Sequence, residues 1–419
     1  MGFVSLGRVK DAAMSHLGSG SVLPIAIDFG VSALKVLQLC GGDPPSLVAA
    51  AAVPTPDEIA GDPAKRFPFQ FQALGRIIRG VSFKGKRAVC SIPAAQMFCK
   101  SMQFPKTDGT DLGQLVEAAV SQALGCPQNA LIYRHVPVVG ASSGGGSGGK
   151  TEVICLAAAR DMVARIMQAV RDSKLELVGI QPEYLASLAA FDRINQRVED
   201  QHVATMYLDL AAGSTKVSIA HGKSLVFAKT VQMGGRDLDH VVARALECDL
   251  ATARARRLAA SVSPAPAPVH QRVPAPVAAT GDSGAPVAVG EELRHHPPAP
   301  TPGLTPDLAA QPAAPVAPAE FDLQEPLEVI TDEVAMCLRY YESIFPERKV
   351  QRAIFTGGEA RHRGLCQHIA RRLRLPAQVA DPAARMARTG KEPCKGVDFG
   401  SPQPGWTIAF GLSMCPTDL

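Results

Sequence analysis

The feature that most constrains the fold of this chain is a β-hairpin pattern that occurs twice. In residues 23–39, two short apolar runs flank a turn that contains Asp28 and Gly30. Residues 204–220 repeat this arrangement, with an aspartate, a glycine and two hydroxyl residues in the turn. Short apolar runs broken by a glycine-containing turn are typical of β-hairpins. Two such hairpins in different halves of the chain predict two lobes that face each other.

The remaining sequence alternates between strand and helix patterns. Residues 86–92 and 350–355 predict strands. Apolar residues at helical spacing predict helices over the ranges 112–124, 161–174, 327–341 and 365–373. The predicted fold class is therefore α/β.

Composition narrows the classes of protein that this chain can be. With 419 residues, of which 46% are hydrophobic, it can bury a sizeable core and make two or more domains. The net charge is only +4, and Lys and Arg form no dense run with interleaved aromatics, so nucleic acid is not the favoured partner. No apolar run reaches about 18 residues, so we expect no transmembrane helix. The cysteines include no Cys-x-x-Cys pair, which fits a reduced, cytosolic setting.

One segment differs from the rest in composition. Residues 259–320 consist largely of Pro, Ala, Val and Ser and lack a periodic apolar face. Such a sequence cannot offset the entropy lost on ordering, so we predict a disordered insertion. We also predict a frayed tail at residues 1–22.

The first hairpin turn carries groups that can bind phosphate and a cation. Backbone N–H groups and the Ser32 hydroxyl can face phosphate oxygens, and Lys35 can neutralise their charge. Asp28 can hold Mg²⁺ through water. The second turn supplies another carboxylate and two hydroxyls at matching places. A third element, at residues 356–360, has two glycines that let a purine or ribose approach the backbone.

These three loops, in this order, resemble the signature of the sugar kinase, Hsp70 and actin superfamily, which has two phosphate hairpins followed by a Gly-Gly adenosine loop. Within that superfamily the chain resembles the PilM-type family of type IV pilus assembly. The resemblance is carried further by residues 180–186, 231–238 and 330–365, and it covers residues 23–258 and 321–415.

The resemblance implies a two-lobed actin-like ATPase (ribonuclease H-like) fold with an added subdomain, termed 1C, and with the disordered Pro/Ala-rich insertion. The implied domains are an N-terminal tail (1–22), the lobe 1 core (23–87), subdomain 1C (88–178), an interlobe helix (179–200), the lobe 2 core (201–240 and 346–404), subdomain 2B (241–258 and 321–345), the insertion (259–320) and a return to lobe 1 (405–419).

The resemblance also implies a site for ATP and Mg²⁺. The residues implied to bind the ATP phosphates are Asp28, Gly30, Ser32, Lys35, Asp209, Gly213, Ser214 and Thr215. The residues implied to bind the nucleoside are Gly234, Gly235, Arg254, Arg257, Gly357, Gly358 and Glu359. Asp28 and Asp209 are expected to hold the metal ion through water.

Glu183 has two interpretations. It can position Mg²⁺ or a water as a catalytic residue, or it can be a helix-start carboxylate that interacts with the helix dipole. ATP binding is favoured over hydrolysis, which we expect to be weak or absent.

The partner implied by the resemblance is a PilN-like inner-membrane protein, recognised by its short cytoplasmic N-terminus. ATP is expected to close the two lobes and thereby to change the affinity for this partner. Other pilus motor components are further possible partners, and the expected location is the cytoplasm, beneath the inner membrane. The related type II secretion protein usually has its own transmembrane helix, so the lack of one favours the pilus.

Two alternatives remain open at this stage. Ala211 stands where the family usually has Gly, and its methyl group could crowd the phosphates, which favours a scaffold with a degenerate nucleotide site. Residues Gly144 to Thr151 match the Walker A pattern, although the β-branched sequence that follows is strand-like and a P-loop must open a helix. A sugar kinase is disfavoured because no acidic catalytic base can be identified near the cleft.

Overall fold

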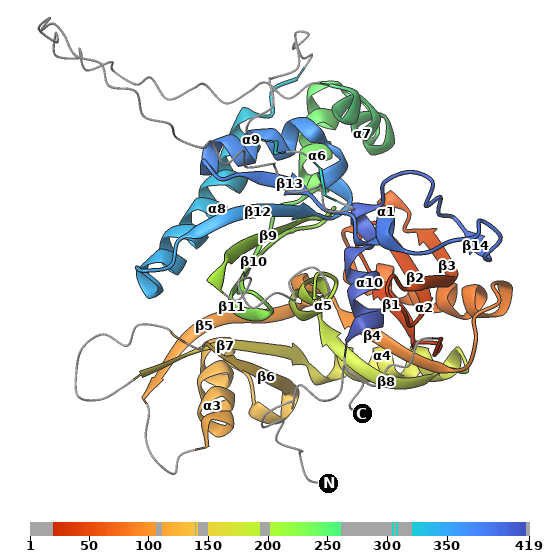
Figure 1. The fold of residues 1–419 in the computed structure, drawn as a ribbon, viewed down its shortest axis with the longest axis horizontal. Helices are drawn as coiled ribbons and strands as arrows, with labels where there is room; N and C mark the ends of the chain where they lie inside the picture. Colours follow the sequence, from red (N-terminus) through yellow and green to blue (C-terminus); the bar gives the residue numbers. More distant parts are fainter. Residues whose placement is uncertain are drawn as a thin grey trace, which may run out of the picture.

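The computed structural model describes residues 20–105, 111–138, 140, 150–192, 202–260, 304–305, 307–308 and 321–415. Within these ranges the chain forms an α/β structure with three sheets (Figure 1). The predictions of an N-terminal tail and of a disordered insertion fall almost entirely on residues outside the described ranges. None of the described helices combines the length and hydropathy that a bilayer-spanning segment requires.

The first sheet is built around the first predicted hairpin. Its strand order is β14-β3-β2-β1-β4-β8, with β1 antiparallel to β2 and parallel to β4. Every residue of β1 is buried, because helices cover both faces of the sheet. The strands are β1 (Ile25–Phe29), β2 (Ala33–Cys40), β3 (Ser46–Pro54), β4 (Arg87–Ile92), β8 (Glu176–Pro182) and β14 (Cys394–Lys395).

The second sheet repeats the topology of the first. Its order is β11-β10-β9-β12-β13, and β9 is antiparallel to β10 and parallel to β12. Apart from β14, each sheet therefore has three consecutive antiparallel strands followed by two parallel ones, which confirms the prediction of two related lobes. The strands are β9 (Ala204–Leu210), β10 (Thr215–His221), β11 (Ser224–Val231), β12 (Val350–Thr356) and β13 (Ala377–Val379).

A third, three-stranded sheet lies between β4 and β8 in the sequence. Its order is β5-β7-β6, formed by β5 (Met97–Pro105), β6 (Leu131–Pro137) and β7 (Lys150–Ala159), with α3 (Leu112–Leu124) packed on it. The predicted subdomain at 88–178 spans this unit together with β4, α4 (Arg160–Asp172) and the start of β8. Of these, β4 and β8 pair within the first sheet, and α4 packs against that sheet's core.

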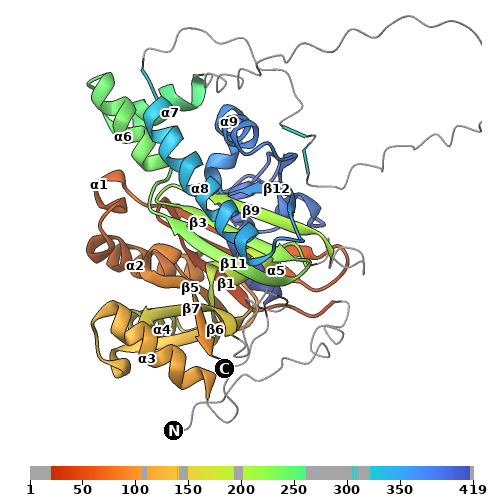
Figure 2. The ribbon, with the colours of Figure 1, turned by 90° about the vertical axis from the view of Figure 1, so that its left-hand side faces the viewer.

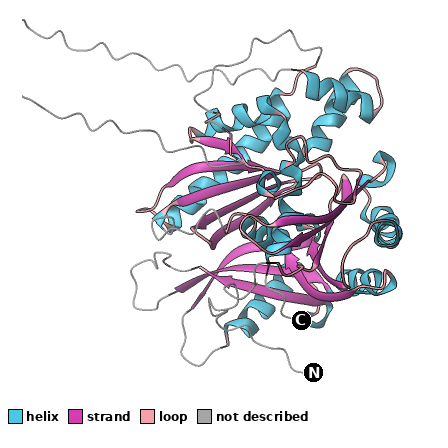
Figure 3. Cartoon of the chain, turned by 45° about the vertical axis from the view of Figure 1, so that its right-hand side comes forward, coloured by secondary structure: helices cyan, strands magenta, loops and turns pink. Residues whose placement is uncertain are grey.

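The predicted helices are all present. The prediction over 112–124 matches α3, and that over 161–174 matches α4. The two later predictions correspond to α8 (Gln324–Ile344) and α9 (Arg363–Leu373). Figure 2 shows α4 beside α2, and Figure 3 shows helices on the outer side of the second sheet. The others are α1 (Asp57–Ala60), α2 (Pro63–Gly80), α5 (Glu183–Ala189), α6 (Gly235–Ala245), α7 (Leu250–Ala259) and α10 (Thr407–Met414).

The chain returns to the first lobe before its end. Strand β14 pairs with β3, so the return begins before the predicted boundary at residue 405. Helix α10 then packs on β1, β2 and β4 and crosses α5, and all eight of its residues are buried. The crossing is close because Gly411 has no side chain: a Cβ there would lie 1.7 Å from the carbonyl oxygen of Ala186 in α5.

We expect Gly411→Ala to destabilise the protein. Alanine favours a helix over glycine by about 1 kcal/mol, so any loss would come from the steric clash with α5, which should cost about 1–3 kcal/mol or more. The measurement is the thermal unfolding midpoint. Gly80→Ala in α2 is the matched control, because its Cβ would meet no atom within 4 Å. A Gly411→Ala protein as stable as the control would contradict this account of the crossing.

Candidate functional site

A small cavity lies where the two hairpin turns meet. Its volume is about 70 Å³, and both lobes contribute to its walls. The first hairpin, the second hairpin, the start of α5 and the turn after β12 all reach it. The lining residues are Asp28, Gly30, Val31, Ser32, Lys35, Pro93, Ala94, Ala95, Glu183, Asp209, Ala211, Gly213, Ser214, Lys216, Gly357, Gly358, Gly405 and Ile408.

Most of the predicted phosphate-binding residues line this cavity. Only Thr215 does not: it is buried and its hydroxyl donates to the Met233 carbonyl, 3.0 Å away. Of the predicted nucleoside residues, Gly357 and Gly358 line the cavity, whereas the other five lie beside it in the second lobe. The sequence therefore predicted the convergence of the loops, although it did not predict how the charges within the cavity pair.

Each hairpin places a lysine directly across from its aspartate. The register pairs Asp28 with Lys35 and Asp209 with Lys216. Directly opposite residues of antiparallel strands have Cβ atoms about 5 Å apart on one face of the sheet, so each pair points the same way. Both lysines follow their aspartate by seven positions. This shared spacing indicates that Lys216 belongs to the site, although the sequence analysis did not include it.

The two lysines are held differently. Lys35 Nζ donates to the Gly405 carbonyl at 2.5 Å and lies 3.7 Å from Asp28 Oδ2. Lys216 Nζ lies 2.8 Å from both Asp209 Oδ2 and Glu183 Oε2, and its side chain is only 8% exposed. The Lys216 ammonium therefore joins a carboxylate of the second lobe to one at the start of α5.

The position of Glu183 explains its pairing. It is the first residue of α5 and is buried, and its Oε2 accepts from Ala94 N at 3.0 Å as well as from Lys216. The carboxylate thus has specific partners on two other segments, beyond the dipole of its own seven-residue helix. These bonds hold it in place within the cavity wall.

Burial and neighbouring charges perturb two groups of the cavity. Burial raises the pKa of Asp28 to about 6, although Lys35 acts in the opposite direction. Burial alone would lower the pKa of Lys216, but the carboxylates of Asp209 and Glu183 outweigh it and raise that pKa above its ordinary value. Asp28 can therefore take up a proton near pH 6.

Two glycines allow the close approach of the loops. Gly357 has φ +88°, and a Cβ there would lie 2.4 Å from Asp209 Oδ1. A Cβ on Gly213 would lie 2.7 Å from Val31 Cγ2, so the two hairpin turns touch at this point. Gly358 is different, because a Cβ on it would meet no atom within 4 Å. The donors and the open backbone fit a phosphate group.

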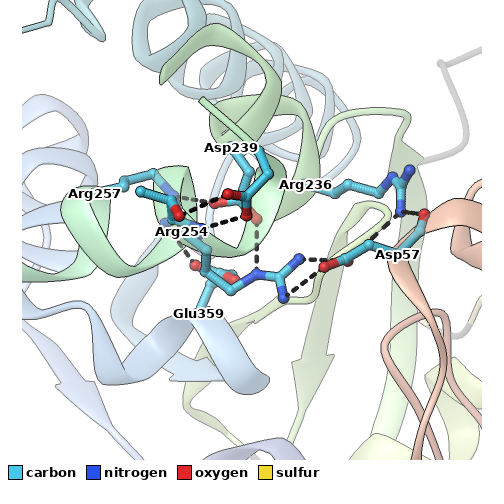
Figure 4. Close-up of polar contacts among 8 residues, drawn as sticks. Asp57, Arg236, Asp239, Arg254, Arg257 and Glu359 are labelled. Carbon is cyan, nitrogen blue, oxygen red and sulfur yellow. Dashed lines mark hydrogen bonds and ion pairs between the residues drawn. The ribbon is translucent and has the colours of Figure 1, made fainter. Parts of the chain in front are cut away.

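An ion-pair network lies beside the cavity, among the predicted nucleoside residues (Figure 4). Arg257 is fully buried, with Nε 2.7 Å from Asp239 Oδ1 and Nη1 2.8 Å from Glu359 Oε2. Arg254 joins Asp239 to Asp57, which lies on α1 of the first lobe. The network therefore fills the space between α6, α7 and the loop after β12, and connects it to the other lobe.

Glu359 covers one of the predicted nucleoside glycines. A Cβ on Gly235 would lie 2.1 Å from Glu359 Oε1, so the carboxylate packs directly on this glycine. Gly234 is similarly enclosed, since a Cβ there would lie 2.5 Å from Ser214 N. Gly234 is therefore covered by backbone atoms of the second hairpin turn, and Gly235 by the Glu359 side chain.

The Walker A match is not followed by a helix. Residues 141–149 lie outside the described ranges, and Lys150 and Thr151 begin strand β7, where they pair with Pro105 and Phe104 of β5. A P-loop presents its lysine at the start of a helix, so the observed strand argues against this interpretation.

Comparisons with known proteins agree with this architecture. A family model described as type IV pilus assembly protein PilM matches residues 26–270, more than half of the chain. A solved structure described as the PilM-PilN type IV pilus biogenesis complex is similar at 18% sequence identity and a TM-score of 0.66, over 94% of this chain and 97% of that chain. This match shows a shared fold.

Other structural matches are more distant. Ethanolamine utilization protein EutJ from Carboxydothermus hydrogenoformans has 12% identity and a TM-score of 0.43, over 94% of this chain and 89% of that chain. MreB5 of Spiroplasma citri bound to ADP has 10% identity and a TM-score of 0.41, over 93% and 94%. No curated protein sequence matches the chain.

We expect Asp28→Asn to stabilise the fold at pH 8. A carboxyl whose pKa is raised in the folded state opposes folding when it ionises, by up to about 3 kcal/mol for a rise from 3.8 to about 6. The gain should be largest above pH 6 and should fall by roughly half at pH 5, where Asp28 is mostly protonated in the folded state. Chemical denaturation at both pH values measures it. Asp161→Asn, on the exposed face of α4, should show no such gain.

The ion-pair network yields a second expectation. Asp239→Asn removes the shared partner of two arginines, and because Arg257 is fully buried the loss should be about 3–5 kcal/mol. Asp57→Asn should cost about 1 kcal/mol or less, since Asp57 and Arg254 are both partly exposed. Unfolding midpoints of the two variants test this order, and equal losses would contradict it.

Proposed function

Because this chain belongs to the family of type IV pilus assembly protein PilM and has its actin-like fold, we propose that it binds ATP between its lobes and docks on a PilN-like inner-membrane protein. The proposal of ATP binding rests on one observation. Four charged side chains converge on one cavity: Asp28, Lys35, Asp209 and Lys216. The two lysines, the hydroxyls and the glycine backbone N–H groups form a donor set suited to phosphate, while the aspartates can only accept.

The cavity size implies that the lobes move. A volume of about 70 Å³ holds a few waters, whereas sites that enclose drug-sized ligands have about 300–1,000 Å³. A triphosphate therefore enters when the lobes separate, and its phosphates then bridge the two hairpins. ATP in this way shifts the population between open and closed molecules.

The residues predicted to bind the nucleoside include groups that can contact a base or ribose. Arg257 Nη2 is buried without an acceptor among the described residues, and Gly358 has open space beside it. When the lobes open, the contact of Arg254 with Asp57 breaks, because these residues lie on different lobes. Arg254, Arg257 and Glu359 can then turn toward the nucleoside.

Hydrolysis is proposed to be weak or absent. A general base must be free to accept a proton from water. Glu183 instead receives hydrogen bonds from Lys216 and Ala94, so its carboxylate is held away from that role. The chain is thus proposed to respond to ATP occupancy.

The partner is proposed from the family and from the matched complex. The similar structure contains PilM with PilN, so we propose a PilN-like protein, docked through its cytoplasmic N-terminal segment, as the membrane partner. We also propose a location in the cytoplasm at the inner membrane, where other pilus motor components are further candidate partners. The alternative is a scaffold that keeps the fold and the partner but binds no nucleotide.

The proposed ATP site is tested by measuring ATP binding. Trp406 is the only tryptophan in the sequence and follows Gly405, a cavity residue, so its fluorescence can report on occupancy. We expect Lys35→Ala to weaken ATP binding at least tenfold, because it removes a cation that faces the phosphates. Lys150→Ala, at the Walker A position, should leave binding unchanged. Absence of binding by the unaltered protein would favour the scaffold.

Partner coupling is tested with a synthetic peptide of the cytoplasmic N-terminus of the PilN-like protein from the same organism. Saturating ATP should change peptide affinity about 5-fold or more, the range of typical allosteric coupling, and Lys35→Ala should abolish that change. Isothermal titration with and without ATP measures it. A peptide affinity that ATP does not affect would refute lobe coupling while leaving the docking intact.

A further inference from the structure

The ammonium of Lys216 is fixed between two carboxylates that come from opposite sides of the cavity. Its Nζ lies 2.8 Å from Asp209 Oδ2 and 2.8 Å from Glu183 Oε2. The β9-β10 register fixes Lys216 directly across from Asp209, and both residues line the cavity. The position of this positive charge is therefore set by the sheet and by the start of α5.

The first hairpin provides an internal comparison. Lys35 stands across from Asp28 in the same way, but its Nζ is 3.7 Å from the carboxylate and donates to the Gly405 carbonyl. Its side chain is 18% exposed, compared with 8% for Lys216. Hairpin geometry alone thus does not force a close ion pair, and Lys216 is distinguished by its second carboxylate.

The residues around Lys216 do not fit a magnesium ion. Mg²⁺ requires near-octahedral oxygen coordination, usually from one or two carboxylates and several waters. Here Asp209 Oδ2 and Glu183 Oε2 are already bonded to Lys216, and Asp209 Oδ1 packs close to Gly357. Among the described residues, no cluster of three or more Asp, Glu, His or Cys side chains could hold a metal. A dication beside the ammonium would also be repelled.

Lys216 has the capacity to contact a phosphate directly. An ammonium group has three N–H donors, and the two carboxylates engage two of them. The third is available to an oxygen in the cavity that Lys216 lines. Lys216 from the second lobe and Lys35 from the first can then approach the same phosphate chain from two sides.

We infer that the Lys216 ammonium stands in place of the divalent cation in this site, so that the chain binds ATP without Mg²⁺. The inference rests on the proposed nucleotide binding. It assigns to Lys216 a specificity role: the residue links Asp209 and Glu183 to the phosphates, which a hydrated metal ion would otherwise do.

The direct test is ATP binding by the unaltered full-length protein in excess Mg²⁺ and in excess EDTA. Isothermal titration and Trp406 fluorescence should give dissociation constants in EDTA that are equal to or lower than those in Mg²⁺, within about threefold. Binding that weakens more than threefold in EDTA would overturn the inference and leave nucleotide binding in place. An absence of binding in both conditions would overturn the proposed ATP site together with the inference.

Variants distinguish the proposed role of Lys216 in metal-free ATP binding from its contribution to the stability of the fold. Lys216→Met should weaken ATP binding at least tenfold in EDTA, and Mg²⁺ should restore much of it. Lys216→Arg, which keeps the charge, should remain independent of Mg²⁺. The matched control is Lys35→Met, which should weaken binding by the same factor in both conditions. Metal-independent binding by a folded Lys216→Met protein would overturn the role of Lys216.

A second variant covers the case in which Lys216→Met does not fold. Lys216→Met leaves the carboxylates of Asp209 and Glu183 without their cation. Adding Glu183→Gln removes one of these two charges. Circular dichroism and the unfolding midpoint confirm that it is folded before titration. This double variant should again require Mg²⁺ for tight ATP binding, and equal affinity in Mg²⁺ and EDTA would contradict the inference.

Discussion

The structure depends on a buried ion triplet at the meeting point of its lobes. Lys216 and Asp209 belong to the second sheet, whereas Glu183 begins the helix that leaves the first. A buried charge without partners is costly, so each member constrains the positions of the other two. Glu183 also accepts a hydrogen bond from Ala94 N, in the turn that follows β4, so this turn is held at the same point. The lobes are thus aligned by charge at the cavity as well as by packing at α5 and α10.

The two hairpins show how a repeated fold can acquire different chemistry. Both place a lysine opposite an aspartate, but the pKa of Asp28 is raised to about 6 by burial, while Asp209 is tightly paired. The first hairpin therefore has a carboxyl that can change its charge near pH 6, and the second has a close ion pair. In the second hairpin a third residue, Glu183, also contacts the lysine, and it reaches the ion pair from the start of α5.

Sequence patterns predicted the elements and the convergence of the loops, but not the pairing of charges. Apolar spacing is a local property, so the helix at 112–124 and both hairpins were predictable. The pairing of Arg254 with Asp57, or of Lys216 with Glu183, joins residues far apart in the sequence and depends on the completed fold. The placement of β4 beside β1 depends in the same way on long-range pairing, which the local sequence pattern does not reveal.

The late return of the chain to its first lobe has a consequence for biosynthesis. Helix α10 covers β1, β2 and β4, yet the ribosome makes it only after the whole second lobe. At about 5–20 residues per second, the nascent first sheet waits on the order of tens of seconds with that apolar face uncovered. Nascent chains of this topology should therefore be substrates for chaperones that bind apolar surface, until translation supplies the missing helix.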